Sequence, residues 1–243
     1  MTKTTADLSS LWVYLAASPL LSLTVTLVTF QCCVWLNKKL GKSALFHPVL
    51  LSMAVLITFL KVANISYETY FKGAQFVHFL LGTATVALAI PLYHHLDWVK
   101  RMFFPLMIAC FTGATTAALS AVAVGIWMGA SRETIMSLAP KSVTSPIAMG
   151  ISEKIGGLPA LTAGLVLITG AIGCLIAAPL YRLLNIRHDS VKGFALGLSA
   201  HGFGTAYAFD ISQLAGAFAG LAIGLTGIVS AFLLPLLLKS LGI

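Results

Sequence analysis

Long uncharged blocks alternate with short charged stretches along this chain. Seven runs contain no charged residue: residues 8–37, 43–60, 73–96, 102–131, 155–181, 193–209 and 211–238. A helix needs roughly 17 to 25 residues to cross a hydrocarbon core of ~30 Å. The pattern therefore predicts an all-α polytopic membrane protein with about seven transmembrane helices.

Composition agrees with that pattern, since 58% of the 243 residues are hydrophobic and the mean hydropathy is +0.96. Soluble globular domains contain a smaller share of apolar residues. The first apolar run has no small-residue cleavage site, so we expect it to stay as a signal anchor. Cys32, Cys33, Cys110 and Cys174 lie inside apolar runs without paired spacing, which predicts neither a disulfide, a metal site nor a cofactor.

The segment from residue 133 to residue 154 breaks the pattern. It contains most of "LAPKSVTSPIAMGISEKIGGLPAL", residues 138–161, which has three prolines and a Glu-Lys pair. Its longest uncharged run has 11 residues, too few to span a membrane. An irregular backbone at membrane depth must be surrounded by protein or line a wet cavity, because unpaired peptide groups are costly in lipid. We therefore expect a re-entrant or broken segment.

The distribution of Lys and Arg supports this interpretation. If the segment returns to the side it came from, nine basic residues are cytoplasmic and four are external. If it spans, the count becomes six inside against eight outside. Basic residues collect in cytoplasmic loops, so the first arrangement is favoured. It places the N-terminus outside and the C-terminus inside, and it explains the net charge of +8 without nucleic-acid binding.

The same arrangement makes the spans before and after the segment run in opposite directions, as in an inverted 3+3 repeat. Lys72-Gly73, Gly82 and Thr85 recur 120 positions later as Lys192-Gly193, Gly202 and Thr205. Interrupted segments at corresponding places are typical of transporter binding sites. We predict one membrane domain, residues 1–243, made of an N-terminal helix (1–43), a first repeat (44–129), the re-entrant segment (130–158) and a second repeat (159–243).

The broken segment carries the main candidate chemistry. Pro140 and Pro146 interrupt any helix around Lys141, Ser142, Thr144 and Ser145. Free amides, hydroxyls and an ammonium group suit a carboxylate or phosphate. The alternative interpretation is an interfacial loop with a snorkelling lysine.

Other candidates lie elsewhere in the chain. His201 and Thr205 in the 193–209 run, and Thr85 in the corresponding earlier run, could contact the same ligand. His201, Glu153 and Asp210 are candidates for coupling to H⁺ or Na⁺, although His201 could equally form a bond between helices that only maintains packing. Gly193 and Gly197, like Gly216, Gly220 and Gly224, are spaced for close helix packing. No nucleophile, base and orienting residue form a recognisable triad, so we do not expect an enzyme.

The stretches "PKSVTSPIAMGISEKIGGLPALTA" and "RLLNIRHDSVKGFALGLSAHGFGTA" resemble the LrgB/CidB family of bacterial membrane proteins, as does "NISYETYFKGAQFVHFLLGTATVALAIPLY". The resemblance runs from about residue 35 to the C-terminus. It implies two competing functions, control of murein hydrolases and lysis beside a small LrgA/CidA-type partner, or transport of small monocarboxylates as in plastid glycolate/glycerate translocators. Members commonly have an arginine where this chain has Tyr207, so an anion anchor is missing here.

Of the two, the broken basic segment favours a secondary transporter of small monocarboxylates of the glycolate, glycerate or pyruvate kind in the bacterial inner membrane. The alternative is an antiholin- or holin-like pore or a regulator of murein hydrolase activity and cell lysis. Glycine seams between helices also favour a homo-oligomer.

Overall fold

The computed structural model of the chain describes residues 19–40, 46, 48–87, 89–94 and 96–242. Within these ranges the regular structure is helical, with no strand, so the all-α prediction is confirmed. Four of the described helices are long and apolar enough to cross a membrane: α2 (Pro19–Lys39), α7 (Phe103–Trp127), α10 (Pro159–Leu183) and α12 (Gln213–Ser240). The chain is a membrane protein, and the finer prediction of seven spans stays a prediction.

Two compact units divide the chain, Met1–Ala87 and Leu88–Ile243. In the first unit α2 packs with α3 (Pro48–Val62) and α4 (Tyr67–Ala87), and the hydroxyls of Thr26 and Tyr70 lie 2.7 Å apart. The boundary between the units falls inside the predicted first repeat. The expected signal anchor was the run over residues 8–37, and its first part, residues 8–18, lies outside the described residues.

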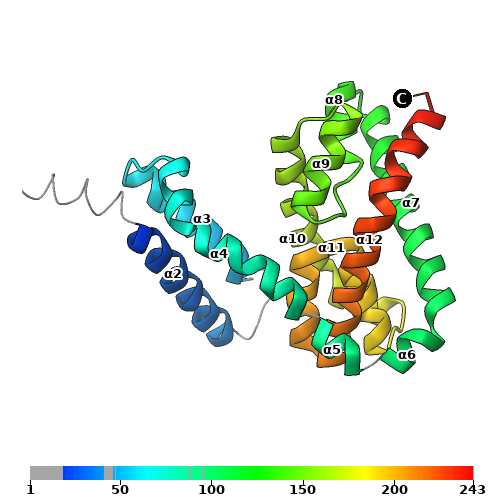
Figure 1. Cartoon of the computed structure of the whole chain (residues 1–243), viewed down its shortest axis with the longest axis horizontal. Helices are drawn as coiled ribbons and strands as arrows, with labels where there is room; N and C mark the ends of the chain where they lie inside the picture. Colours follow the sequence, from blue (N-terminus) through cyan, green and yellow to red (C-terminus); the bar gives the residue numbers. More distant parts are fainter. Residues whose placement is uncertain (1–18, 41–45, 47, 88, 95, 243) are drawn as a thin grey trace, which may run out of the picture. The chain divides into compact units, whose positions relative to one another are not determined.

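The second unit, shown in Figure 1, contains the predicted broken segment. Its remaining helices are α5 (Ala89–His94), α6 (Leu96–Arg101), α8 (Arg132–Leu138), α9 (Ser145–Ile155) and α11 (Asp189–Ile211). All four cysteines are described, and each is a free thiol.

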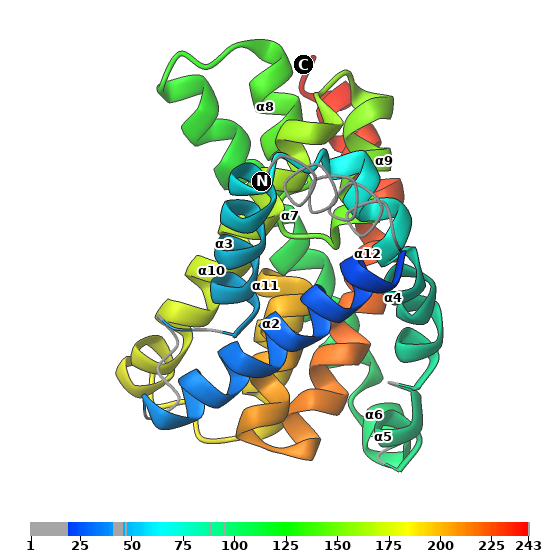
Figure 2. The same cartoon turned by 90° about the vertical axis from the view of Figure 1, so that its left-hand side faces the viewer.

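The helices α8 and α9 form a hairpin. Between them, residues 139–144 form turns, as the two prolines predicted. The backbone N–H of Leu158, just beyond α9, donates to Ser137 Oγ at the end of α8 over 2.8 Å, so the chain has doubled back. Gly156 ends α9 in the left-handed region at φ 84°, a conformation that glycine adopts without strain. Figures 1 and 2 show this hairpin at the end of the unit that holds the C-terminus.

The helix α11 is a second hairpin, which the sequence did not predict. His201 has φ 40° and ψ −123°, so helical geometry stops there. After this residue the chain folds back, because Gly204 approaches the backbone carbonyl of Leu196. At the base of the hairpin the Ser212 hydroxyl donates to the Asp189 carboxylate. The prediction of a single span over residues 193–209 is therefore wrong.

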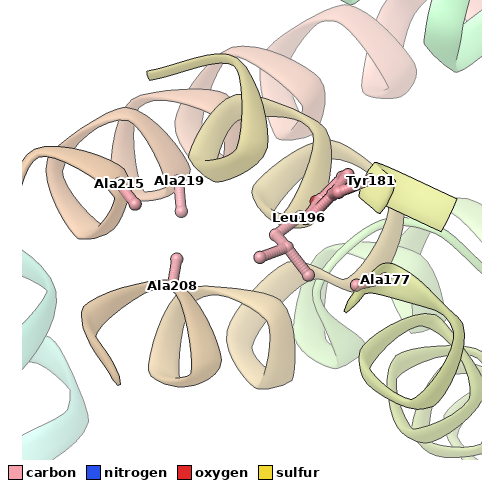
Figure 3. Close-up of a cluster of buried hydrophobic side chains, with 6 residues drawn as sticks. All are labelled: Ala177, Tyr181, Leu196, Ala208, Ala215 and Ala219. Carbon is pink, nitrogen blue, oxygen red and sulfur yellow. The ribbon is translucent and has the colours of Figure 1, made fainter. Parts of the chain in front are cut away.

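Glycine makes this second hairpin compact. A Cβ atom on Gly193 would collide with the backbone carbonyl of Ala215, and one on Gly197 with that of Ala219. Figure 3 shows Ala208, on the returning arm, pointing toward Ala215 and Ala219 of α12. These contacts confirm the predicted packing role of Gly193 and Gly197. In contrast, Gly224 has open space around its Cα.

The two hairpins occupy opposite ends of the unit. The helix α12 starts at the base of the α11 hairpin, and Leu238 near its other end packs against Ile135 and Met136 of α8. The C-terminus and the loop at residues 184–188 thus lie at opposite ends. The expected cytoplasmic position of the C-terminus depended on a span over residues 193–209, where α11 reverses instead.

Candidate functional site

The tips of the two hairpins meet at α10. Val143 in the first tip is buried against Ala148 of α9 and Val166 of α10. His201 in the second tip lies with Nε2 3.0 Å from the backbone carbonyl oxygen of Val166. A carbonyl only accepts, so Nε2 carries the proton in this bond. Val166 of α10 therefore contacts both tips. Ile147, near the start of α9, also contacts Gly227 in the middle of α12.

Beside this junction is a cavity of about 450 Å³, which we call the Lys141 cavity. Its walls come from α7, the first tip, α10 and the first arm of α11. Apolar side chains form most of it, and Lys141 is the charged residue among the lining: Ala117, Lys141, Ser142, Thr169, Ile172, Gly173, Ile176, Ala177, Leu180, Tyr181, Ala195, Leu196 and Ser199.

Lys141 is half-buried in the turn between α8 and α9. Its Nζ atom lies 3.5 Å from Ser142 Oγ, a long contact, and its charge acts on the His201 ring. Among the described residues the one ion pair joins Lys192 to Asp189, so no described carboxylate pairs with Lys141. A cation in a small, largely apolar cavity attracts an anion strongly, since little water screens the charge.

The hydroxyl residues predicted beside Lys141 are divided by the structure. Ser142 is buried and lines the cavity. Thr144 is the N-cap residue of α9, but its side chain forms no capping bond, and neither it nor Ser145 belongs to the lining. The first amides of α9 have no partner within the helix, and they form the positive end of the helix dipole. The helix begins at Ser145, four residues after Lys141.

His201 and Thr205 stabilise the second tip. The Thr205 hydroxyl donates to the backbone carbonyl of His201 over 3.0 Å, and the His201 ring donates to α10. Both side chains are buried and neither lines the Lys141 cavity. The structure thus shows the packing bond that the sequence left open for His201, and ligand contact by these two residues stays a prediction.

The remaining candidates lie apart from the cavity. Glu153 and Asp210 are exposed and belong to no part of its lining, so their coupling role stays a prediction. Thr85 belongs to α4 in the first unit, and its side chain lies outside the described residues.

A buried group of hydroxyls, which was not predicted from the sequence, braces the first hairpin. Thr162 Oγ1 of α10 lies 2.7 Å from Ser152 Oγ of α9 and 3.1 Å from the Ser137 carbonyl of α8. All three side chains have no exposed surface. Small polar residues in and beside the broken segment could have indicated this group, because hydroxyls that become buried need hydrogen-bond partners.

The part of the cavity wall formed by α10 was not predicted from the sequence either. Thr169 and Tyr181 lie within an apolar run that was treated as a plain span. Ser199, two residues before His201, also lines the cavity. Its hydroxyl donates to the Ala195 carbonyl over 2.6 Å, which leaves its oxygen available as an acceptor. The sequence did show one hint, since Thr169 and Ser199 are polar residues in two apolar runs, and these runs line the same cavity.

Known proteins with similar sequences identify the family. The LrgB-like family matches residues 26–240. The uncharacterized protein YwbG of Bacillus subtilis is 37% identical over 192 residues, covering 79% of this chain and 85% of YwbG. The antiholin-like protein LrgB of Bacillus cereus (strain B4264) is 30% identical over 225 residues, covering 93% of this chain and 98% of that protein. No solved structure matches. With nearly its whole length matched, this chain belongs to the LrgB-like family.

Proposed function

We propose that the protein is a secondary transporter that binds a small monocarboxylate at Lys141 and carries it across the bacterial inner membrane. The observation that carries this proposal is the half-buried Lys141 ammonium, without a described carboxylate partner, in a cavity between two hairpin tips. An ionisable residue held inside a membrane protein is costly and is usually functional.

The size and lining of the cavity define the substrate class. A volume of about 450 Å³ accommodates a small molecule. Lys141 supplies one positive charge for one carboxylate. The hydroxyls of Ser142 and Thr169 can bond a hydroxyl or keto oxygen on the same molecule, and Ser199 Oγ can accept from a hydroxyl group. Glycolate, glycerate and pyruvate have this combination of one charge and one or two polar substituents.

The arrangement of the second unit also supports transport. The helix α7 is followed by the α8–α9 hairpin, and α10, which runs the other way, is followed by the α11 hairpin. A span followed by a re-entrant hairpin is thus repeated in opposite orientation, with the binding site where the tips meet. Inverted repeats with interrupted helices around a central site are typical of secondary transporters. This smaller repeat, over residues 103–155 and 159–211, replaces the 3+3 scheme in our proposal.

The distribution of charge suggests the orientation. Lys100, Arg101, Arg182, Arg187 and Lys192 lie at the end of the unit where the α11 hairpin starts, and Arg132, Lys154 and Lys239 lie toward the other end. By the positive-inside rule, the end with five basic residues faces the cytoplasm. The C-terminus then lies outside, which a reporter fusion at residue 243 compared with one at residue 186 would test.

The decisive experiment compares Lys141 variants in proteoliposomes. Removing a charge at ~4 Å from the carboxylate removes ~1 to 4 kcal/mol of attraction at an effective dielectric between water and a protein surface. Lys141→Ala should therefore weaken binding of labelled glycolate, glycerate or pyruvate by about one to two orders of magnitude, at ~1.4 kcal/mol per tenfold change. Lys141→Arg keeps the charge and should lose less.

Lys154→Ala is the matched control, because Lys154 is exposed at the far end of α9 and lines no part of the cavity. It should bind and transport like the parent. All variants are compared as monodisperse protein after size-exclusion chromatography. Transport by Lys141→Ala at the parental rate and affinity would refute the proposal.

A second candidate function is antiholin-like control of murein hydrolase activity and lysis, and the names of the relatives favour it more directly than they favour transport. In this case the protein would act as a homo-oligomer or with a small LrgA/CidA-type partner. The discriminating test is complementation of a lysis phenotype by Lys141→Ala in a deletion strain. Full complementation, together with the absence of carboxylate binding by the parent protein, would support this second function.

A further inference from the structure

A second cavity, of about 590 Å³, lies where α10 ends and α11 begins. We call it the basic cavity, because Arg182, Arg187 and Lys192 line it and no acidic residue does. Tyr181, Asn185 and Tyr207 contribute polar groups to the same wall. The cavity therefore combines three cations with hydroxyl and amide groups, at the end of the unit with the most basic residues.

The basic cavity and the Lys141 cavity share one residue, Tyr181. This side chain is 8% exposed, and its hydroxyl donates to the backbone carbonyl of Lys192 over 2.8 Å. Figure 3 shows it beside Leu196, which lines the Lys141 cavity. Tyr181 thus borders both spaces, and one hydrogen bond ties its hydroxyl to the start of α11.

The charges facing the basic cavity remain positive in sum. Asp189 pairs with Lys192 over 2.8 Å, and Asp210 acts electrostatically on Tyr207. Arg182 Nε donates to the Ala178 carbonyl over 3.4 Å, and Arg187 Nε donates to the Asn185 side chain over 3.1 Å. Each of these bonds uses one nitrogen of a guanidinium group, which has five N–H donors, so both arginines keep donors for a ligand.

We propose that the basic cavity is an access site for the same small carboxylate, which binds there first and passes Tyr181 to reach Lys141. This inference rests on the proposed function. Two arginines can bind a carboxylate with paired N–H donors, and a positively charged concave surface raises the local concentration of anions. The surface site would collect the substrate, and the deeper site with one lysine and apolar walls would select it.

The test uses the double variant Arg182→Gln/Arg187→Gln in full-length protein in proteoliposomes. At low salt, its KM for labelled glycolate or pyruvate should rise about three- to tenfold with little change in maximal rate, because the lost effect is attraction to the access site. The difference should shrink as salt is added, since screening weakens attraction between exposed charges. Lys100→Gln/Arg101→Gln is the control with the same change of net charge, outside both cavities.

A cysteine probe tests whether the position of Tyr181 is reached from the basic cavity. In a variant with the four native cysteines replaced by Ala, Tyr181→Cys should react with a water-soluble anionic thiol reagent. Replacing Arg182 and Arg187 by Gln should slow that reaction several-fold at low salt, because the reagent would approach through the basic cavity.

The outcomes separate this inference from the proposed function. If Lys141→Ala loses carboxylate binding while Arg182→Gln/Arg187→Gln matches its control at every salt concentration, the access site is refuted and the transporter stands. Transport that survives Lys141→Ala unchanged, but shows the salt-dependent rise in KM in the arginine variant, would keep the basic cavity and remove Lys141 as the binding group. A parent protein that transports no carboxylate would overturn both.

Discussion

Both hairpins of the second unit reverse the chain, but they are held in different ways. The α8–α9 hairpin is braced by side-chain hydroxyls, those of Ser137, Ser152 and Thr162, and its tip presents a lysine to a cavity. The α11 hairpin is held by direct backbone packing at Gly193 and Gly197, and its tip is a buried histidine bonded to α10. Side-chain bonds can break and form again, whereas helices packed backbone to backbone cannot shift without separating. The first hairpin is therefore the better candidate for movement, and the second for a fixed support.

The largest expected effect comes from breaking the backbone packing of the second hairpin. Gly197→Ala places a Cβ atom against the Ala219 carbonyl and forces the helices apart. Overpacking of this kind typically costs about 1 to 3 kcal/mol and sometimes more. We expect a clear drop in the melting temperature of the detergent-solubilised protein, followed by static light scattering.

The matched control is Gly224→Ala in α12, where nothing lies within reach of the added methyl group. It should leave stability unchanged or raise it slightly, since alanine is the better helix former. If both variants have the same melting temperature, close glycine packing is not what holds the second hairpin, and the contrast with the first hairpin fails.

An intermediate effect should follow from removing one hydroxyl that braces the first hairpin. Thr162→Val keeps the shape of the side chain but leaves Ser152 Oγ and the Ser137 carbonyl without that partner. A buried polar group without a partner costs about 1 to 3 kcal/mol. Amide hydrogen exchange over residues 132–157 should increase, with little change over residues 202–211.

Thr115→Val serves as the control, because this exposed hydroxyl bonds only the Phe111 carbonyl of its own helix. Uniform destabilisation of both hairpins by Thr162→Val would show that they unfold as one structure, against the contrast drawn above.

The smallest effect concerns the base of the second hairpin, where the pKa of the Asp189 carboxyl is lowered by hydrogen bonds from Lys192 and Ser212. A lowered pKa means that this carboxylate stabilises the fold above its ordinary pKa of 3.8, and the stabilisation is lost as the pH falls below that value. Exposed ion pairs contribute under about 1 kcal/mol. Asp189→Asn should therefore melt slightly below the parent at pH 7, and the gap should narrow as the pH falls below 3.8. A larger gap at acid pH would contradict this.

The sequence predicted the first hairpin and missed the second, and the reason is physical. Prolines and charges interrupt residues 133–154, and they leave a visible mark because lipid tolerates neither. The turn at His201 involves no proline or charge, since buried glycines let the two arms pack on each other and on α12. A run of 17 apolar residues fits a span and a buried hairpin equally well, so hydropathy could not separate them.

The candidate site at Lys141 could likewise be predicted only in part. Lys141 and Ser142 were found because they stand out against an apolar background. Tyr181 and Thr169 were not, because polar residues in a long helix give no sign of which neighbour they face until the packing is known. The basic cavity depends on the reversal at His201, which brings Tyr207 back toward Arg182.

The meeting of both tips at Val166, inside the unit, has an electrical consequence. If water and ions enter the Lys141 cavity from the basic end, the membrane potential does not fall evenly over the whole bilayer, but mainly across the part that stays closed. A full membrane potential of 100 mV is worth about 2.3 kcal/mol for each elementary charge that crosses it. Most of that energy would act on the short path beyond Lys141, past the hydroxyls of Ser137, Ser152 and Thr162. The voltage across the membrane would then act chiefly on the step that opens the first hairpin, and only weakly on the capture of the anion.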